Sequence, residues 1–503
     1  MMVNAPRLVV SLPARTAADA RAEAREAADA GADLAEVRLD RWDPLERERA
    51  AALFPSPLAL LATLRSRAEG GEGPDDPAER AAALRALADL PFEGLDLEAA
   101  RDLALLPTLP THLAVRIVSS HLRPGTAESD VVGTLRSALG GEAIRKVVVP
   151  ASVGTFLRVL LPRIPPSGDG ARLLLTTGAS GALCRAWAAR LEYPIVFTSL
   201  PERPGGATRP TVEPSQIPVD RLRWFLSGGR EAPLFGILGR PVAHSQSPYL
   251  HARWMERSAH PGLYVPIEIE SESEFVDALP ALAAGGFRGL NVTHPWKPVA
   301  LAVASRVTRA AETCAVANLL TFREGEIEAD NTDLIAILRR LGELRSSDDW
   351  DGGELAVVGA GGAAAATLAA ARELGARAGV IARDTARAAP VAAQFGAELL
   401  DPARPRPFPL LVHATPVGRP DDADLGVAIA PWIDERSRLI DWVYTPAHPV
   451  LRETAQRRGA AYEDGWRLLV YQAAASFGIW WGEEPDEAEV AATIEEGPCA
   501  VSA

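Results

Sequence analysis

Two lysines in this sequence stand where an amine could act on a carbonyl group. Lys146 lies in the run Arg145–Val149, where three valines follow it. Burial in such a strand favours the neutral amine, which can attack a ketone and form a covalent imine. Lys297 ends the segment NVTHPWK, and an ammonium there could donate a proton to a carbonyl oxygen. The alternative for Lys146 is a lysine that faces solvent from an edge strand.

Other ionisable residues of the first half suit the same chemistry. His121 could act as a base beside an amine nucleophile, and a carboxylate such as Glu69 could orient it. Glu36 and Arg38 are two residues apart in an apolar run, so both would point to one side of a strand. Arg65, like Arg38, could bind an anionic substrate. His121 by itself would more often be a loop histidine than a catalyst.

Strand and helix signals alternate regularly through the first 200 residues and would position these side chains. Helical runs such as Ala17–Ala30, Ala78–Leu90 and Val131–Leu139 separate most of the apolar strand candidates. Eight strands with interleaved helices predict a (β/α)8 barrel, whose chemistry lies at the carboxyl ends of the strands. The candidate strands are Leu8–Leu12, Leu34–Leu39, Leu58–Leu64, Gly94–Leu97, Leu113–Val118, Arg145–Val149, Leu173–Thr176 and Ile195–Phe197.

The segment Glu354–Ala371 has the pattern of a nucleotide-binding strand, turn and helix. An apolar strand, Leu355–Val358, leads into a turn that contains Gly359, Gly361 and Gly362, and an alanine-rich helix follows. Glycines allow a tight turn and the close approach of a pyrophosphate, which the N–H groups of the helix N-terminus can bind. Similar turns also occur as plain packing, so the motif alone leaves dinucleotide binding open.

Polar residues outside this turn would supply a second site. Ser245 and Ser247 precede Pro248 at a predicted helix start, where hydroxyl groups suit a carboxylate ligand. For one of these serines, and for Asp333 taken singly, a helix cap is the competing interpretation. Gln472 lies in an otherwise apolar helix and needs a hydrogen-bond partner, which could be purely structural. The remaining candidates are Thr293, Lys297 and Asn318.

Four segments of the first half combine these residues in a recognisable order. They are Asp33–Asp40, Thr63–Glu72, Ser119–His121 and Arg145–Pro150. In this order they make residues 5–227 resemble type I 3-dehydroquinate dehydratase. Enzymes of this family work through a lysine Schiff base. One departure precedes Gln216, where Val212–Ser215 replace the small hydroxyl residue and glycine usual in the family. Another Schiff-base lyase or an aldolase is the alternative for this half.

The resemblance implies roles for the ionisable residues of the first half. Lys146 would form the Schiff base, His121 would be the general acid and base, and Glu69 would be the partner of His121. An iminium acidifies the adjacent carbon, and the histidine that removes this proton can then protonate the leaving hydroxyl. The implied substrate contacts are Glu36, Arg38, Arg65, Arg185 and Gln216.

The polar segments of the second half, together with the glycine turn, resemble shikimate dehydrogenase across about residues 233–485. The resemblance implies a substrate lobe and a Rossmann lobe, with Lys297 as proton donor and Asp333 as the residue that orients it or relays protons. The implied substrate-binding residues are Ser245, Ser247, Thr293, Asn318, Tyr444 and Gln472. The implied NADP-binding residues are Gly359, Gly361, Gly362, Ala363, Arg383 and Thr415.

The choice of cofactor depends on the end of the strand Ala378–Ala382. An arginine such as Arg383 accommodates the phosphate of NADP, whereas NAD enzymes commonly present an acid there. Asp384 and Ala382 depart from the usual residues of the family, which leaves NAD open as the cofactor. Quinate oxidation with NAD is an alternative activity for this half. A metabolite sensor derived from the same two domains, which binds without turnover, is a further alternative. The other departures are Ala252, Leu334, His413 and Arg419, and we assign no role to His413 or Arg419.

The two halves explain each other, since dehydration of 3-dehydroquinate gives 3-dehydroshikimate, which the second half would reduce to shikimate. The sequence therefore predicts an α/β protein in which a (β/α)8 barrel precedes a two-lobed α/β dehydrogenase. The expected domains are residues 1–228 for the barrel, 233–345 for the substrate lobe, 346–465 for the Rossmann lobe, and 466–503 for a returning helix and a polar tail.

Length and composition exclude some other classes of protein. The chain has 503 residues and a formal charge of −14, which argues against binding to nucleic acid or to an anionic membrane surface. No span of about 20 strongly hydrophobic residues is visible. The three cysteines have no metal-binding spacing and suit a reducing compartment. We therefore expect a cytoplasmic enzyme of small-molecule substrates without a metal, and the oligomeric state stays open.

Overall fold

The structure is a computed structural model that describes residues 5–137, 139, 143–164, 171–202, 209–229, 231–415, 423–444 and 449–498. The chain divides into two compact units. The first consists of Met1–Gly236 and Met255–Phe287, and the second consists of Ile237–Trp254 and Arg288–Ala503. In the described part of the chain, every helix is too short or too polar to cross a lipid bilayer.

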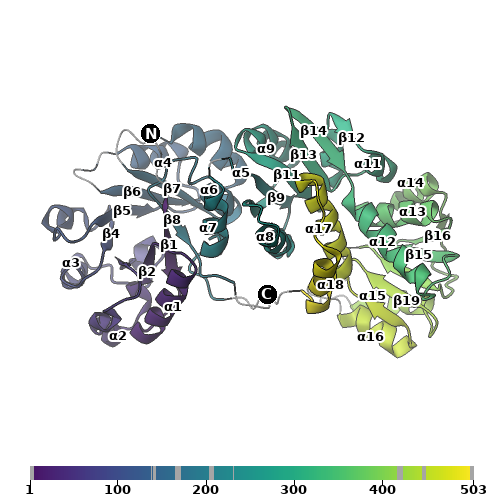
Figure 1. Ribbon diagram of the computed structural model, residues 1–503, viewed down its shortest axis with the longest axis horizontal. Helices are drawn as coiled ribbons and strands as arrows, with labels where there is room; N and C mark the ends of the chain where they lie inside the picture. Colours follow the sequence, from purple (N-terminus) through teal and green to yellow (C-terminus); the bar gives the residue numbers. More distant parts are fainter. Residues whose placement is uncertain are drawn as a thin grey trace. The chain divides into compact units, whose positions relative to one another are not determined.

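The first unit contains a sheet of eight parallel strands that follow one another in sequence order (Figure 1). The strands are β1 (Arg7–Leu12), β2 (Leu34–Arg38), β3 (Leu60–Thr63), β4 (Gly94–Glu98), β5 (Val115–His121), β6 (Ile144–Pro150), β7 (Arg172–Thr177) and β8 (Ile195–Thr198). Strand β8 returns to pair with β1, so that Val9 lies between Leu34 and Phe197. The (β/α)8 barrel predicted from the sequence is confirmed.

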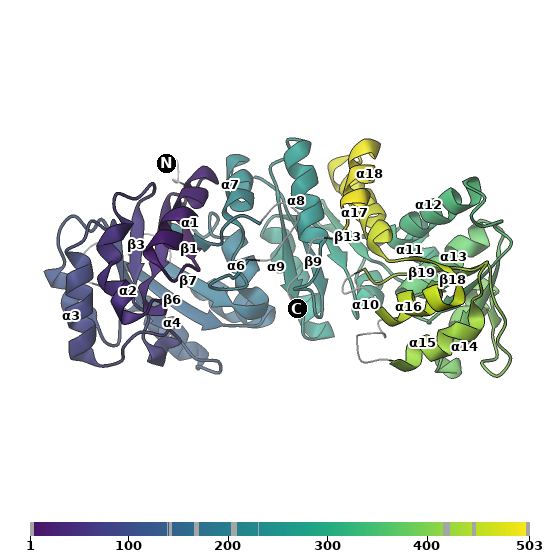
Figure 2. The ribbon, with the colours of Figure 1, turned by 90° about the horizontal axis from the view of Figure 1, so that it is seen from below.

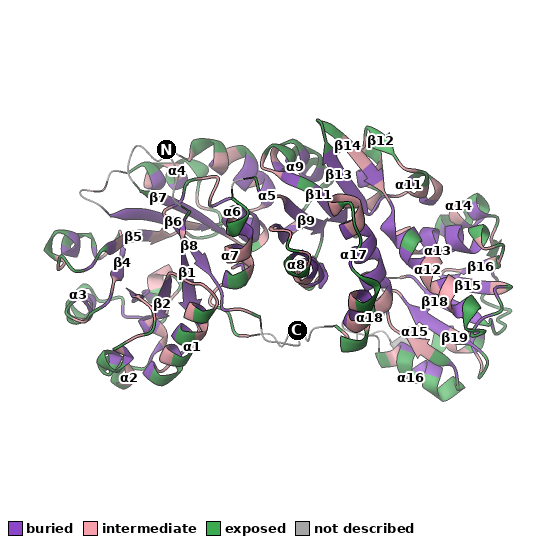
Figure 3. Ribbon diagram, in the orientation of Figure 1, coloured by how far each residue is buried: buried purple, intermediate pink, exposed green. Residues whose placement is uncertain are grey.

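The longer helices between the strands bury one side and expose the other (Figure 3). The first of them begins after Thr16, whose hydroxyl accepts a hydrogen bond from the backbone N–H of Asp19 at 3.2 Å. It then buries alanines three and four residues apart, which is the spacing of one helix face. The helices are α1 (Ala17–Asp29), α2 (Pro44–Glu48), α3 (Pro77–Ala88), α4 (Glu128–Arg136), α5 (Val153–Thr155), α6 (Gly181–Ala186) and α7 (Val219–Ser227).

A mixed six-stranded sheet carries the polar segments that follow the barrel. Its strands are β9 (Leu234–Gly239), β10 (Leu263–Glu268), β11 (Phe287–Val292), β12 (Arg306–Val307), β13 (Leu319–Arg323) and β14 (Glu326–Asp330), in the order β10-β9-β11-β13-β14-β12. The hairpin β13–β14 is antiparallel, and the residues that flank it, Asn318 and Asn331, therefore lie at one end of the sheet. The helices are α8 (Ser247–Arg257), α9 (Glu272–Ala284), α10 (Lys297–Ala302), α11 (Arg309–Cys314) and α12 (Thr332–Ser346).

A parallel six-stranded sheet lies entirely in the second unit (Figure 1, Figure 2). Its strands are β15 (Glu354–Val358), β16 (Arg377–Ile381), β17 (Glu398–Leu399), β18 (Leu410–His413), β19 (Arg438–Asp441) and β20 (Ala461–Glu463). Their order, β17-β16-β15-β18-β19-β20, is the doubly wound order of dinucleotide-binding domains, which confirms the predicted Rossmann lobe. The helices are α13 (Gly362–Glu373), α14 (Thr385–Phe395), α15 (Ala423–Ile429), α16 (Pro449–Arg458), α17 (Trp466–Trp481) and α18 (Glu487–Glu496).

The strands of this sheet are buried on both faces, as a parallel sheet requires. Val357 packs on one face with apolar residues of α12, α13 and α14. Its neighbours Ala356 and Val358 pack on the other face with residues of α15 and α16. Alternate side chains of β15 therefore pack against the two layers of helices, one on each face of the sheet. The glycine turn follows β15 at the carboxyl edge of the sheet.

Candidate active sites

Lys146 lies in β6 and is buried, and its ammonium is paired with an acid. Its Nζ donates a hydrogen bond to Oδ2 of Asp96 in β4 at 2.8 Å and lies 4.0 Å from the centre of the Phe197 ring. Lys146 is 4% exposed and Asp96 is 2% exposed. The burial expected from the neighbouring valines is present, and β4 adds a carboxylate partner that the sequence did not predict. The amine must lose a proton before it can attack a ketone.

His121 is the last residue of β5 and forms a pair with Glu69. Oε2 of Glu69 lies 3.2 Å from Nδ1 of His121 and accepts its backbone N–H at 3.0 Å. Burial raises the pKa of Glu69 to about 7, although the charge of Arg65 opposes this rise. Burial, followed by the charges of Arg65 and Lys146, lowers the pKa of His121 well below its ordinary value. A neutral imidazole, which can accept a proton, is therefore the resting form.

Two acids that the sequence analysis missed complete this cluster. Asp96 and Glu98 are two residues apart in β4, and both are buried. Arg65 donates to Oδ2 of Asp96 at 3.0 Å and contacts Oε1 of Glu98 at 3.5 Å. The predicted substrate contact Arg65 is thus surrounded by carboxylates of the protein. The spacing of the two acids in β4 was the available signal, since the same spacing had singled out Glu36 and Arg38.

Gln216 and Glu36 lie in a second hydrogen-bonded group of the barrel. Glu36 accepts hydrogen bonds from Ser11 at 2.6 Å and from Thr63 at 2.8 Å. Nε2 of Gln216 donates to the hydroxyl of Ser11 at 3.0 Å. Oε1 of Gln216 is buried and, among the described residues, has no hydrogen-bond partner. A hydroxyl group of a ligand would satisfy this oxygen, so the position suits the predicted role in substrate binding.

The two other arginines predicted to bind substrate are each held by the protein. Arg38 forms a bidentate pair with Asp40 through two hydrogen bonds of 2.8 Å. Arg185 is buried, which lowers its pKa, and it donates to the hydroxyl of Ser215 at 3.2 Å. Ser215 in turn donates to Glu213 at 2.7 Å. The segment that departs from the family pattern is therefore anchored on Arg185.

Lys297 and Asp333 form an ion pair in the second unit. Lys297 is the first residue of α10, and Asp333 is the second residue of α12. Oδ1 of Asp333 also accepts a hydrogen bond from Nδ2 of Asn318 at 2.9 Å. The side chain of Asn331 caps α12 by accepting from the N–H of Leu334, so Asp333 is not the helix cap. The ammonium of Lys297 is thus held in place by a carboxylate that Asn318 orients.

Gln472 in α17 belongs to the network behind this pair. Its Nε2 donates to the carbonyl of Leu469 at 3.1 Å, and its Oε1 lies 3.5 Å from the hydroxyl of Thr332. Asn318 donates to the same hydroxyl at 3.0 Å. The predicted substrate-binding residues Gln472 and Asn318 are therefore linked through Thr332, which the sequence analysis did not single out.

The hydroxyl-bearing residues predicted to bind substrate in the second unit come from three segments. The backbone N–H of Ser247 donates to Oγ of Ser245 at 3.2 Å, as a helix cap would, and the N–H of Gln246 donates to the Tyr444 hydroxyl at 3.4 Å. Burial raises the pKa of Tyr444, so its hydroxyl keeps its proton. Thr293 lies directly after β11 and is half-buried. These groups suit a ligand that carries carboxylate and hydroxyl groups.

The glycine turn between β15 and α13 has the shape that a dinucleotide phosphate requires. Gly359 has a φ of +123°, and a Cβ at this position would lie 2.8 Å from the carbonyl oxygen of Ala414. Gly361 precedes the first residue of α13 and has open space where a side chain would be. The first N–H groups of the helix can therefore meet a phosphate.

The same turn lies against two other predicted site residues. A Cβ on Gly362 would be 3.1 Å from Cδ of Lys297, and a Cβ on Gly359 would be 2.8 Å from Cγ2 of Thr415. Ala363 follows in the first turn of α13. Lys297 and the glycine turn therefore lie side by side, an arrangement that would suit hydride transfer to a ketone.

The residues after β16 fit the phosphate of NADP better than the free ribose of NAD. Arg383 is exposed two residues beyond the strand. The carboxylate of Asp384 accepts the N–H of Arg387 at 3.0 Å and so serves as the cap of α14. Asp384 is therefore used as a helix cap, whereas Arg383 is exposed to solvent. In the described part of the chain, no three His, Cys, Asp or Glu side chains are grouped to hold a metal ion.

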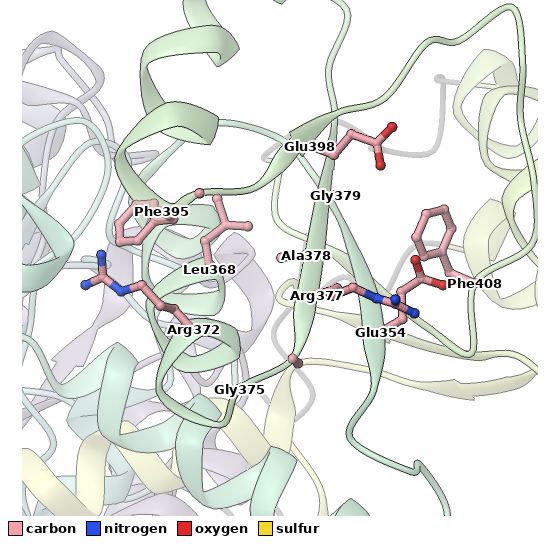
Figure 4. A pocket seen from close by; sticks show the side chains of 12 residues that line it. Glu354, Leu368, Arg372, Gly375, Arg377, Ala378, Gly379, Phe395, Glu398 and Phe408 are labelled. Atoms are coloured by element: carbon pink, nitrogen blue, oxygen red, sulfur yellow. The ribbon is translucent and has the colours of Figure 1, made fainter.

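A cavity of about 410 Å³ lies elsewhere in the Rossmann lobe (Figure 4). It is bordered by Glu354 and Arg377, the first residues of β15 and β16, and by the apolar side chains of Leu368, Phe395 and Phe408. None of the predicted site residues lines it. Because the nucleotide turn follows the other end of β15, this cavity is separate from the cofactor site.

Comparison with known families assigns both halves of the chain. Residues 8–228 match the family described as type I 3-dehydroquinase. Residues 237–320 match the family described as shikimate dehydrogenase substrate binding domain. The first match contains Lys146, and the second contains Lys297.

Individual relatives agree with the second match. A shikimate dehydrogenase (NADP(+)) from Paracoccus denitrificans is 38% identical over 270 residues, which is 51% of this chain and 93% of the relative. A shikimate dehydrogenase (NADP(+)) from Acidiphilium cryptum is 36% identical over 278 residues, 52% of this chain and 94% of the relative. Among solved structures, a dehydroquinate dehydratase and shikimate dehydrogenase from S. pombe covers 97% of this chain and 98% of its own, with 21% identity and a TM-score of 0.43.

Proposed function

The chain belongs to the shikimate dehydrogenase family, with a type I 3-dehydroquinase domain before it, and on this premise we propose that it catalyses two consecutive reactions. The barrel dehydrates 3-dehydroquinate to 3-dehydroshikimate. The second unit reduces 3-dehydroshikimate to shikimate with NADPH. The observation that carries the proposal is the presence of two separate amines, each with its own acid-base partner: Lys146 near His121, and Lys297 on Asp333.

The barrel site has the groups that an imine-forming dehydration needs. Asp96 holds the amine in position through their shared hydrogen bond, but against the effect of burial the charges of Lys146 and Arg65 keep the pKa of Asp96 below its ordinary value and make it a weak base. The proton that Lys146 loses would pass to the neutral imidazole of His121 and return to the ketone oxygen as that oxygen leaves. The free amine adds to the ketone carbon, and the ketone oxygen leaves as water to give an iminium. His121 then removes the proton from the adjacent carbon, the electron pair forms the new double bond, and the protonated imidazole gives its proton to the departing hydroxyl. Hydrolysis of the imine releases the product and restores Lys146.

The second site has the groups that a carbonyl reduction needs. NADPH supplies the hydride that reaches the ketone carbon. Lys297 donates the proton that the ketone oxygen takes up, and Asp333 holds the ammonium in position. The turn at Gly359 and Gly361 would hold the pyrophosphate, and Arg383 would pair with the phosphate on the ribose.

The direct test supplies purified full-length protein with 3-dehydroquinate and NADPH. Shikimate should form in an amount equal to the NADPH oxidised, and NADH should be a poorer cofactor. When neither NADPH nor NADH is added, the reaction should stop at 3-dehydroshikimate, which absorbs in the ultraviolet. Oxidation of NADPH without formation of shikimate, or no consumption of 3-dehydroquinate, would contradict the proposal.

The Glu69–His121 pair predicts the pH dependence of the dehydration. Ionised Glu69 accepts Nδ1–H of His121 and leaves Nε2 as the base, and this arrangement is lost when Glu69 takes up a proton. Because the pKa of Glu69 is raised to about 7, kcat/KM for dehydration should fall as the pH decreases through about 7. In Glu69→Gln this decrease should disappear, and the activity at high pH should be lower by on the order of 10²-fold.

The measurement is a pH profile of dehydration for both proteins, with the reduction of 3-dehydroshikimate recorded in the same samples. The reductase profile should be identical in wild type and variant, because Glu69 lies in the barrel. An unchanged dehydratase profile in Glu69→Gln would assign the titration to another group.

A further inference from the structure

Two buried residues of the Rossmann lobe, His413 and Asp441, form a hydrogen-bonded network with the half-buried Thr415. His413 ends β18 and Asp441 ends β19, and the parallel register places them opposite each other. Both are fully buried. Nδ1 of His413 lies 2.8 Å from Oδ1 of Asp441, and Nε2 lies 2.6 Å from the hydroxyl of Thr415. His413 is also a position at which this sequence departs from the family pattern.

The contacts of Asp441 determine the direction of the hydrogen bonds among these three residues. Oδ1 of Asp441 accepts the backbone N–H of Val443 at 3.0 Å, and Oδ2 accepts the hydroxyl of Tyr462 at 3.4 Å. A carboxylate oxygen that accepts an N–H is an acceptor toward His413 as well, so Nδ1 of the histidine must carry a proton and donate. In the neutral ring Nε2 is then an acceptor, and the Thr415 hydroxyl donates to it.

The orientation of this hydroxyl has a consequence for a ligand. A hydroxyl group has one proton, and Thr415 uses that proton on His413. Toward any ligand, Thr415 can therefore only accept a hydrogen bond. Thr415 also lies against the nucleotide turn, because a Cβ on Gly359 would be 2.8 Å from its Cγ2.

We propose that His413, held by Asp441, is a positioning residue that turns the Thr415 hydroxyl into an obligate acceptor for the carboxamide N–H2 of the nicotinamide ring. The inference deepens the proposed NADPH-dependent reduction and rests on it. The alternative for the same three residues is a structural hydrogen-bond network that ties β18 to β19 without affecting the ligand.

The test compares ligands that differ at one group. NADP carries the carboxamide, 3-acetylpyridine adenine dinucleotide phosphate has a methyl group in place of the amine, and adenosine 2′,5′-bisphosphate lacks the ring. Dissociation constants are measured by calorimetry on the full-length protein for wild type, Thr415→Val, His413→Asn and the double variant. Asparagine keeps an N–H for Asp441 but has no group that replaces Nε2. Thr415→Ser is the matched control that retains the hydroxyl.

Wild type and Thr415→Ser should prefer NADP to the acetylpyridine analogue by about two- to tenfold, the contribution of one hydrogen bond. Thr415→Val and His413→Asn should each lose this preference, the double variant should lose no more than Thr415→Val, and all proteins should bind adenosine 2′,5′-bisphosphate equally. A preserved preference in His413→Asn, or equal weakening of all three ligands, would overturn the inference. Failure of wild type to bind NADP at all would instead contradict the proposed function.

Discussion

Lys146→Ala is expected to abolish the conversion of 3-dehydroquinate to 3-dehydroshikimate, with a loss of about 10⁴-fold or more in kcat. Without the amine no iminium can form, and the proton that His121 removes is no longer acidified by an electron sink. The NADPH-dependent reduction of 3-dehydroshikimate should continue nearly unchanged, because Lys297 and Asp333 lie in the other compact unit. Two separate assays on the same preparation measure both activities.

Lys146→Arg separates the chemistry from the ion pair. Removal of the Lys146 side chain leaves Asp96 buried without its ammonium partner, which destabilises the barrel by up to about 3 kcal/mol. Arginine keeps a positive charge near Asp96 but forms no imine, so it should be as inactive as alanine and closer to wild type in thermal unfolding. In wild type, borohydride with 3-dehydroquinate should leave a covalent adduct on Lys146, detectable by peptide mass spectrometry. An adduct on another residue, or dehydration by Lys146→Arg, would reject Lys146 as the nucleophile.

The barrel was predictable from the sequence because its strands are buried on both faces. Such strands appear as continuous apolar runs, and a lysine that interrupts one of them is conspicuous. Asp96 was missed because apolar and acidic residues alternate in Gly94–Glu98, which is the pattern of a half-exposed strand. The contact between Asp96 and Lys146 joins residues 50 positions apart. No local pattern contains that pairing, since it depends on β4 and β6 lying on either side of β5.

In the second unit, too, the sequence did not predict hydrogen bonds between residues that are far apart in the chain. Lys297 and Asp333 were recognisable as a pair, and the structure explains why Asp333 is free of a capping role: Asn331 performs it. The pairing of His413 with Asp441 depends on the register of β18 against β19, which the sequence does not specify. The residues found from sequence lie in dense motifs, whereas Asp96 and the pair His413 and Asp441 were missed because their partners lie on other strands.

Lys297→Met should lower kcat for the reduction of 3-dehydroshikimate by about 10³-fold, within the range for loss of a general acid. Methionine keeps an unbranched stem beside the nucleotide turn, where Cδ of Lys297 lies 3.1 Å from the position of a Cβ on Gly362, but it donates no proton. The affinity for NADPH should therefore change by less than about threefold. Stopped-flow oxidation of NADPH and equilibrium fluorescence titration measure the two quantities, and dehydration by the same protein is the internal control.

The double variant Lys297→Met with Asp333→Asn distinguishes a lost proton donor from a damaged fold. In the single variant Asp333 keeps its charge, with 7% of its side chain exposed, and among the described residues the amide of Asn318 remains as its hydrogen-bond partner. This should cost on the order of 1–3 kcal/mol of stability. Asparagine removes the unpaired charge, so the double variant should recover thermal stability and yet remain as inactive as the single variant. If activity returned together with stability, the ammonium of Lys297 would be a structural group, because catalysis would then depend on the packing of α10 and α12 and not on the proton that Lys297 supplies.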